Sequence, residues 1–414
     1  MPLPPSDISR RRLLAGAGAA LVATSSGARA QATADPFRVL RASDKAGDGT
    51  GDDMWGYDAV APGPQLRFTR GEELRVRLIN GLAVPTSLHW HGVRTPNAMD
   101  GTVPLIAPAI PAGKSFDYRF RLPDAGTYWY HAQAADQVDR GLYGALIVAE
   151  AEPVAVDRDV VLVLGMPTDA DGVPFRVNGA VRPDITVQRG ERLRLRLINA
   201  TSARGLALRF EGHAPWVMAI DGQPSEPFRA RDSRVGLAPG GRTDLFIDMT
   251  QDPGAATPLV AGVRDAQPIA RLVYAPGREA PSPARPAPSP LPANPLPAHI
   301  DLRTSLRAEF ALANPKPLDP AGPPLFSVKR GRAVTLAIRN GTGIPQVVHV
   351  HGHAFRLLDR LDDGWKPYWM DTLVVGGEIE RVGFVADNPG KWPITFRPLE
   401  QRDRDGASWF AVTG

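Results

Sequence analysis

One pattern of alternating apolar and polar residues occurs three times along the chain. It covers residues 70–80, 189–199 and 330–340, and the copies begin 119 and 141 residues apart. Each copy opens with Arg-Gly, continues as an alternation and ends in Asn. A period of two is typical of a β-strand with one face on a core and the other in solvent. The spacing is too long for a solenoid, so the pattern predicts three homologous domains.

A second shared phrase supports this division. Residues 123–130 and 387–394 each place a turn before a strand rich in aromatic or branched side chains. The chain contains 41 Gly and 42 Pro, which suits an all-β fold with many turns. Residues 276–298 are dense in proline and predict an extended linker over the surface. We therefore expect an all-β protein of three Greek-key β-sandwich or barrel domains, at residues 35–150, 151–275 and 299–414.

The first 30 residues have the three parts of an export signal. Three arginines, Arg10, Arg11 and Arg12, precede an apolar stretch, and Ala28-Arg29-Ala30 has the form of a cleavage site. Paired arginines after Ser9 resemble a twin-arginine signal. The alternatives are a plain secretory signal or a retained membrane anchor. We expect residues 1–30 to direct export to the periplasm, with no membrane span left after cleavage.

Charge and cysteine content narrow the range of functions. The net charge is +4, but the signal contributes four arginines against one aspartate, which leaves +1 for the mature chain. The basic residues are also scattered, so nothing indicates nucleic-acid binding. The chain has no cysteine, which excludes disulfides and thiolate metal sites.

Histidines form the strongest chemical signal. His89 and His91 make one H-x-H pair, His349 and His351 make another, and His131 ends an aromatic run. Residues i and i+2 of a strand point to one face, so each pair presents two imidazoles side by side. Pairs from two domains could converge on one metal ion, and imidazole suits copper, zinc or iron.

These motifs carry a specific resemblance to a known family. The phrases around the histidines, and two phrases of the middle domain, are similar to the conserved segments of multicopper oxidases. They lie at residues 88–101, 126–144, 177–179, 220–224, 348–355 and 388–410. The resemblance implies three consecutive cupredoxin-like domains. It also implies a type-1 copper that takes up electrons and a trinuclear copper cluster that reduces dioxygen.

The resemblance leaves the type-1 site without ligands. The position of its cysteine is occupied by Phe396, and its histidines correspond to Gln346 and Gln401. The axial position corresponds to Gly406. We expect no blue copper here, with Phe396 filling the space, because protein interiors tolerate few voids.

The trinuclear cluster is partly retained. Five of its eight ligand positions are still histidine, and the other three are Gln133, Thr395 and Arg397. The retained ligands are His89, His91, His131, His349 and His351. We expect one copper or zinc ion held by His89 and His349, with help from another histidine, rather than a full cluster. His353 is expected either to support a neighbouring ligand without binding the metal or to serve in packing.

Arg397 and two acids decide how well a metal fits. A guanidinium about 4 Å from a divalent ion costs on the order of 8 kcal/mol at an effective dielectric near 20. A carboxylate paired with Arg397 would offset that cost, and Glu400 is the expected partner. The resemblance alternatively assigns Asp100 and Glu400 to proton relay toward the cluster.

Three hypotheses follow from these residues. The first is a periplasmic copper-binding protein that uses the retained histidines and lacks oxidase activity of the laccase type. The second is a copper-free exported scaffold that binds a protein partner, as in the division-associated member of this family. The third is an oxidoreductase with an atypical route of electron entry. Whether the chain is an enzyme stays open between them.

Overall fold

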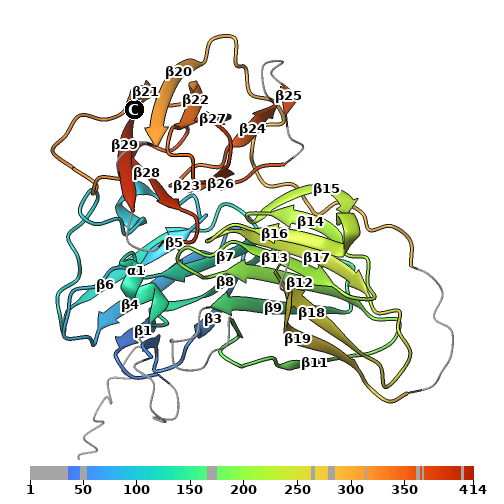
Figure 1. Ribbon diagram of the computed structural model, residues 1–414. Coiled ribbons are helices and arrows are strands. Elements are labelled where there is room, and N and C mark those ends of the chain that lie inside the picture. Colours follow the sequence, from blue (N-terminus) through green and yellow to red (C-terminus); the bar gives the residue numbers. More distant parts are fainter. Residues whose placement is uncertain are drawn as a thin grey trace, which may run out of the picture. The chain divides into compact units, whose positions relative to one another are not determined.

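Nearly all of the regular structure in the computed structural model is β-sheet (Figure 1). The structure describes residues 36–46, 54–165, 175–262, 266–277, 285–312, 315–359, 364–365, 368–401 and 405–414. The expected signal at residues 1–30 lies outside these ranges. Among the described residues, no helix is long and apolar enough to cross a membrane.

The described strands form six sheets, and each of three successive stretches of the chain contributes two of them. This confirms the expected all-β architecture, whereas the exact domain boundaries stay a prediction. Domain 1 contains β1 (Arg38–Ser43), β2 (Gly56–Tyr57), β4 (Glu73–Asn80) and β6 (Ser115–Arg121) in one sheet. Its second sheet contains β3 (Gly63–Thr69), β5 (His89–His91), β7 (Gly126–His131) and β8 (Tyr143–Ala149). Two short helices, η1 (Asn97–Met99) and α1 (Ala135–Asp139), complete it.

Domain 2 repeats this two-sheet plan. One sheet contains β9 (Arg158–Gly165), β10 (Arg176–Val177), β12 (Arg192–Asn199), β14 (Trp216–Ile220), β15 (Gln223–Arg229) and β17 (Arg242–Asp248). The other contains β11 (Asp184–Val187), β13 (Leu206–Phe210), β16 (Arg234–Leu237), β18 (Ala256–Ala261) and β19 (Gln267–Tyr274). A 3-10 turn, η3 (Arg231–Ser233), precedes β16.

Domain 3 has the same plan again. Its first sheet contains β20 (Leu306–Leu312), β22 (Ala333–Asn340), β24 (Arg356–Asp359), β25 (Gly364–Trp365) and β27 (Ile379–Val385). The second contains β21 (Ser327–Lys329), β23 (Gln346–Val350), β26 (Thr372–Val375), β28 (Gly390–Pro398) and β29 (Gly406–Thr413).

The three copies of the sequence pattern occupy equivalent places. They form β4, β12 and β22, and each pairs in parallel with the first strand of its domain and antiparallel with a later one. The glycine that opens each copy has a positive φ of 82° to 88° (88° at Gly71 and 82° at Gly331), which favours a residue without a side chain. The terminal asparagines close the next turn through side-chain hydrogen bonds to two carbonyls, as Asn80 does with Val84 and Ile110.

The second copy differs from the sequence expectation. β4 and β22 alternate between buried and more exposed residues, but every residue of β12 is buried. Its outward side chains include Arg194 and Arg196, each no more than 2% exposed. Domain 1 covers this face, because the apolar side chains of β7 and β8 pack against those of β9 and β12. The expectation of a solvent-facing side was therefore wrong for this strand.

A buried ionic network replaces solvent on that face. Asp244 of β17 accepts hydrogen bonds from Arg194 at 2.6 Å, from Arg196 at 3.2 Å and from Thr127 of domain 1 at 2.5 Å. Glu150 pairs with Arg194 at 2.8 Å. Such a network is stable only when every charge keeps its partner, since an unpaired buried charge is costly.

The proline-rich segment runs along domains 1 and 2. Its described part, residues 285–298, contains neither helix nor strand. Asn294 is buried and bonds to both backbone groups of Ala125 at 2.8 Å and to Gln223 at 2.9 Å. The linker is therefore fixed at this point by side-chain hydrogen bonds.

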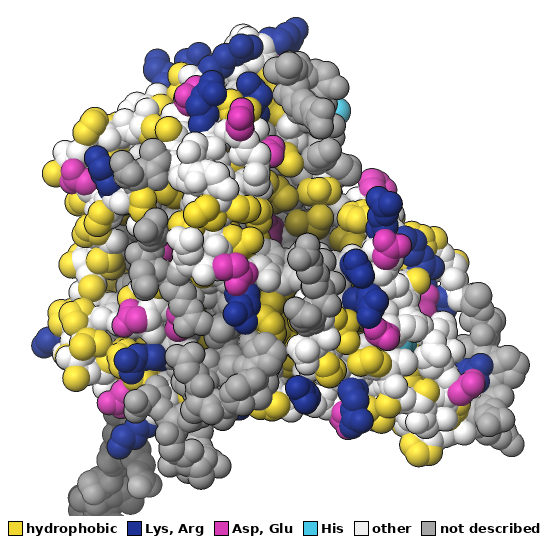
Figure 2. All heavy atoms as spheres, in the orientation of Figure 1, with side chains coloured by type: hydrophobic (Ala, Val, Ile, Leu, Met, Phe, Trp, Pro, Cys, Tyr) yellow, Lys and Arg dark blue, Asp and Glu magenta, His cyan; other side chains and the backbone are white. Residues whose placement is uncertain are grey.

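Charged side chains of both signs are spread over the face seen in Figure 2, with the largest basic group over domain 3 at the top. In domain 3, some exposed basic side chains have acidic partners, such as Arg339 with Glu309 at 2.5 Å and Arg303 with Asp301 at 3.0 Å. Exposed pairs of this kind add little stability.

Removing one charge from the buried network tests its role. We expect Asp244→Asn to lower the free energy of unfolding by about 3 kcal/mol, because two buried guanidinium groups lose their shared counterion. Urea unfolding followed by tryptophan fluorescence measures the change. An unfolding curve identical to that of the wild type would contradict this assignment.

Candidate metal centre

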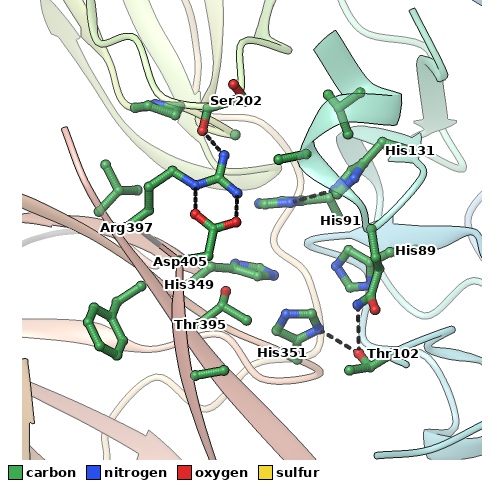
Figure 3. A pocket seen from close by; sticks show the side chains of 18 of the residues that line it. His89, His91, Thr102, His131, Ser202, His349, His351, Thr395, Arg397 and Asp405 are labelled. Atoms are coloured by element: carbon green, nitrogen blue, oxygen red, sulfur yellow. Dashed lines mark hydrogen bonds and ion pairs between the residues drawn. The ribbon is translucent and has the colours of Figure 1, made fainter. Parts of the chain in front are cut away.

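Five histidines meet at the seam between domains 1 and 3. His89 and His91 form β5, His131 ends the neighbouring β7, and His349 and His351 lie at the end of β23. Figure 3 shows their rings gathered in one space. The ring centres of His91 and His349 are 3.9 Å apart, and those of His89 and His351 are 4.3 Å apart. We call these five residues the histidine cluster.

Two of these rings are turned so that a nitrogen is free. The Nδ1 atom of His89 lies 3.0 Å from the carbonyl oxygen of Asp100, and that of His349 lies 3.0 Å from the carbonyl oxygen of Asp371. A carbonyl only accepts, so each Nδ1 carries a proton, and in the neutral form of each ring Nε2 has a free lone pair. Within the described part of the chain, neither Nε2 atom has a hydrogen-bond partner, although both are buried.

Three of the imidazoles lie close enough together to bind one metal ion. Ligand atoms of His89, His91 and His349 all lie within 4.8 Å of one another. Ligating histidines generally donate their other N–H to a carbonyl or carboxylate, which fixes the ring. Leaving a buried acceptor unpaired costs about 1–3 kcal/mol, a cost that a bound cation would remove.

Asp100 and Asp371 occupy matching places around the cluster. The carboxylate of Asp100 lies 3.4 Å from His89 of its own domain and 3.2 Å from His351 of domain 3. The carboxylate of Asp371 lies 3.3 Å from His349 of its own domain and 3.6 Å from His91 of domain 1. Each acid thus contacts one histidine of each H-x-H pair.

Asp371 was missed by the sequence reasoning. Its only signal is a weak one: each H-x-H pair is followed by an aspartate with a threonine one or two positions later, Asp100 with Thr102 and Asp371 with Thr372. The intervals differ, so the parallel is visible only once the fold brings the two acids together.

His131 and His91 form a short chain of imidazoles. His131 Nδ1 lies 2.6 Å from the carbonyl oxygen of Ala132, so it carries the proton, and burial holds the pKa of His131 well below its usual value. Its Nε2 is then the acceptor for His91 Nδ1 at 3.3 Å. The remaining nitrogen of His91 lies 3.2 Å from the hydroxyl of Thr372.

Two of the three substituted ligand positions, Gln133 and Arg397, are engaged elsewhere. Gln133 accepts from the backbone N–H of Val103 at 2.8 Å and donates to Thr102 at 3.0 Å. Arg397 forms a bidentate pair with Asp405, at 2.5 Å for both contacts, and donates to the carbonyl of Ser202. Its charge is therefore neutralised, which removes most of the expected repulsion of a metal ion.

The expected partner of Arg397 was wrong. Glu400 contacts Arg204 at 3.3 Å instead, and its side chain is 52% exposed. Its backbone N–H is bonded to the carbonyl of Ala203, and its φ is +65°, so the local turn directs the carboxylate toward domain 2. A relay role for Glu400 stays a prediction, whereas Asp100 touches the cluster directly.

A cavity of about 250 Å³ adjoins the cluster. Residues from all three domains line it, among them Ser202, Gly240, Thr395 and Arg397. Arg397 and Asp405 lie beside the imidazoles in Figure 3. The space could accommodate a metal ion together with several water molecules.

Three of the four positions matched to type-1 ligands, Gln346, Phe396 and Gly406, are buried in domain 3, whereas Gln401 is partly exposed. Phe396 is 6% exposed and packs against Phe310, with ring centres 5.5 Å apart. It pairs across the sheet with Gly406, where any side chain would collide with the phenyl ring. The Gln346 side chain is buried and donates to Thr342 at 3.0 Å. Phe396 thus fills space in the core, as expected.

The remaining histidines lie outside the cluster. His353 is 3% exposed and packs among Phe384, Trp392 and Phe410. Its Nδ1 also lies 3.2 Å from the carbonyl oxygen of His351, so both expected roles, packing and support of a neighbouring histidine, are compatible with its position. His213 of domain 2 contacts the hydroxyl of Tyr274 at 2.6 Å.

Comparisons with known proteins identify the family. Multicopper oxidase family models match residues 40–153, 120–268 and 290–395. A multicopper oxidase of Pseudomonas thermotolerans has 30% sequence identity and a TM-score of 0.80, covering 91% of this chain and 99% of that one. The chain belongs to the multicopper oxidase family, and its domains are three consecutive cupredoxin-like units.

Further relatives agree with this assignment. Lac15, from a marine microbial metagenome, has 30% identity and a TM-score of 0.78, covering 91% of this chain and 100% of its own. Multicopper oxidase MmcO of Mycobacterium tuberculosis is 29% identical over 407 residues, which is 81% of this chain and 78% of the relative. Family membership implies copper as the metal, and the histidine cluster supplies groups that could bind it.

The buried histidines predict a pH dependence of stability. Burial lowers the pKa of His91, His131 and His349, and that of His351 to about 3. Burial also disfavours charge on His89, but the carboxylate of Asp100 offsets this and raises its pKa. In the unfolded chain all five take up protons near pH 6.5, at about the ordinary value.

We expect the metal-free protein to lose stability as the pH falls from about 6.5 toward about 4, because the unfolded state then binds more protons. His351→Gln removes the proton uptake of one histidine in the unfolded state, so the stability of this variant should depend less steeply on pH across this interval. Urea unfolding at a series of pH values measures both slopes. A free energy of unfolding that rises on acidification would contradict the prediction.

Proposed function

We propose that this chain is an exported copper-binding member of the multicopper oxidase family that holds a single copper ion in the histidine cluster. The main support is the state of His89 and His349. An aspartate carbonyl fixes each ring through Nδ1, and the buried Nε2 of each has no protein partner among the described residues. His91 is the third ligand by proximity. Three imidazoles make a reasonable copper site.

A single ion is favoured over a trinuclear cluster by the substituted positions. Gln133 is already bonded to domain 1 and Arg397 to Asp405, so neither side chain offers an electron pair to a metal. Thr395 supplies only a hydroxyl. The remaining histidines, His131 and His351, are then left for structural support or for water bound to the ion.

We also propose that the chain lacks a type-1 copper. Such a centre needs a thiolate, and the sequence contains no cysteine. The Phe396 ring lies over Gly406, where an added side chain would collide with it, and phenylalanine offers no atom that binds a metal. Without this centre, electrons from an outside reductant have no established entry, so the protein does not act as a laccase-type oxidase.

Export to the periplasm belongs to the same proposal. The support is the arginine pair, apolar stretch and cleavage-like Ala-Arg-Ala within residues 1–30. A periplasmic copper-binding protein could store or traffic the ion.

A copper-free scaffold for a protein partner is the alternative, and the ion pair between Arg397 and Asp405 beside the cluster favours it.

Copper titration tests the proposal. We expect the purified mature protein to bind one Cu(II) ion per chain, with a paramagnetic spectrum typical of nitrogen ligands and without intense blue absorption. His89→Ala and His349→Ala should each weaken binding more than about tenfold, since each removes a ligand. Equilibrium dialysis with metal analysis gives the stoichiometry and the Kd.

His353→Gln is the matched control, because His353 is buried in the same segment but packs among aromatic rings. Its Kd for copper should equal that of the wild type. A wild-type protein that retains no copper after dialysis would sink the copper proposal and favour the scaffold.

Oxygen consumption separates binding from oxidase activity. We expect negligible uptake of dioxygen by the copper-loaded protein in the presence of a phenolic reductant, because no type-1 centre delivers electrons. An oxygen electrode measures the rate. Sustained turnover that disappears in His349→Ala would instead support the oxidoreductase hypothesis.

A further inference from the structure

A buried ion pair joins domain 2 to the histidine cluster, although the cluster contains no residue of domain 2. Arg242 of β17 and Asp371 of domain 3 form a bidentate contact, with distances of 2.8 and 2.5 Å. The Arg242 side chain is 0% exposed and that of Asp371 is 5% exposed. The pair thus connects the two domains without solvent between them.

Every N–H of the Arg242 guanidinium has an acceptor. Besides Asp371, the group donates to the carbonyls of Thr127 at 3.3 Å, Gly240 at 3.2 Å and Asp221 at 2.9 Å. Thr127 belongs to domain 1, so one side chain contacts all three domains. A guanidinium with five fixed partners is held in one orientation.

Asp371 is fixed from a second direction. The backbone N–H groups of Asp371 and Thr372 both donate to the carboxylate of Asp221, at 3.2 and 3.1 Å. The carbonyl of Asp371, which accepts from Nδ1 of His349 at 3.0 Å, is therefore held by domain 2 on both sides of the residue. Its carboxylate reaches His91 at 3.6 Å.

The ion pair between Arg242 and Asp371 packs closely against the first H-x-H motif, at the position of Gly92. Gly92 follows His91 directly and has a φ of +83°, and a side chain there would collide with both Arg242 and Asp371. The glycine of the motif therefore lets the ion pair approach the backbone beside His91. Both H-x-H pairs are in contact with the same pair of charges.

The matching acid, Asp100, is held differently. Among the described residues, it has no ion pair with an arginine, and its partners are Thr102 and the two histidines. Asp371 is instead paired with Arg242. We therefore assign it to the orientation of the His91 and His349 rings rather than to proton transfer. The asymmetry separates the roles of two acids that otherwise occupy equivalent places.

We infer that Asp371, clamped by Arg242, is a positioning residue that sets the ring orientation and tautomer of His349, and that domain 2 thereby controls the affinity of the copper site. The inference deepens the proposed copper function and rests on it for the affinity readout. The tautomer readout is independent of copper.

Copper affinity is the first test. We expect Asp371→Asn to weaken Cu(II) binding by about 10- to 100-fold, the range found when groups that orient metal ligands are removed. The double variant Arg242→Met with Asp371→Asn removes both charges of this pair, and the carboxylate of Asp221, which lies 3.5 Å from Arg242, keeps its backbone N–H donors at Asp371 and Thr372. It should show a similar loss of copper affinity. Both should change the paramagnetic spectrum of the bound copper.

Asp244→Asn is the matched control. Asp244 lies two residues from Arg242 on β17, is equally buried, and pairs with Arg194 and Arg196 rather than with the pair beside the cluster. It should lower stability while leaving the Kd and the spectrum of copper within twofold of the wild type. A loss of copper affinity in this control equal to that of Asp371→Asn would overturn the positioning role.

The tautomer of His349 is the second test. Nitrogen-15 NMR of the metal-free wild type should show His349 protonated at Nδ1. Asp371→Asn keeps the main-chain carbonyl but loses the carboxylate 3.3 Å from Nδ1 and the bidentate pair with Arg242 that holds the residue in place, so it should populate the Nε2–H form. A folded Asp371→Asn protein with an unchanged tautomer, or with wild-type copper affinity and spectrum, would refute the inference. If the wild type binds no copper, the copper proposal fails by itself, and the NMR result still decides whether Asp371 positions the ring.

Discussion

The structure depends on two imidazole nitrogens of the histidine cluster that, within the described part of the chain, are buried without a protein partner. A neutral histidine satisfies itself most easily by bonding at both ring atoms, yet His89 and His349 bond only at Nδ1. The carbonyls of Asp100 and Asp371 impose that tautomer, and the fold brings both Nε2 atoms into one space. Such an arrangement is costly in an empty site and favourable in one that holds a cation.

The surrounding charges are balanced so that a cation is tolerated. Arg397 at a former ligand position would repel a divalent ion, but Asp405 neutralises it. Arg242 is likewise neutralised by Asp371. These pairs leave the carboxylate of Asp100 as the least compensated charge at the cluster. Domain 2 contributes no histidine to the cluster. It contributes the guanidinium of Arg242, which fixes Asp371 beside His349 of domain 3.

Much of this could be predicted from sequence because the signals are local. The alternation in residues 70–80, 189–199 and 330–340 specifies three strands, and the H-x-H spacing places paired rings on one face. The buried arginines of β12 could not be anticipated, since Arg194 and Arg196 look like a solvated face until domain 1 covers them. Asp371 depends on a contact with Arg242 across 129 residues, for which a single sequence gives no register. Asp405 lies only eight residues from Arg397, but the pairing of β28 with β29 that brings them together was not placed from the sequence.

The central claim is that the chain holds one copper ion and no electron-accepting blue centre. Metal analysis of the protein isolated from its native compartment, without added metal, tests this most directly. The account predicts one copper ion per chain, bound by nitrogen ligands and without the intense blue colour of a type-1 centre. A protein that carries no copper, or an intensely blue one with several copper ions, would contradict it.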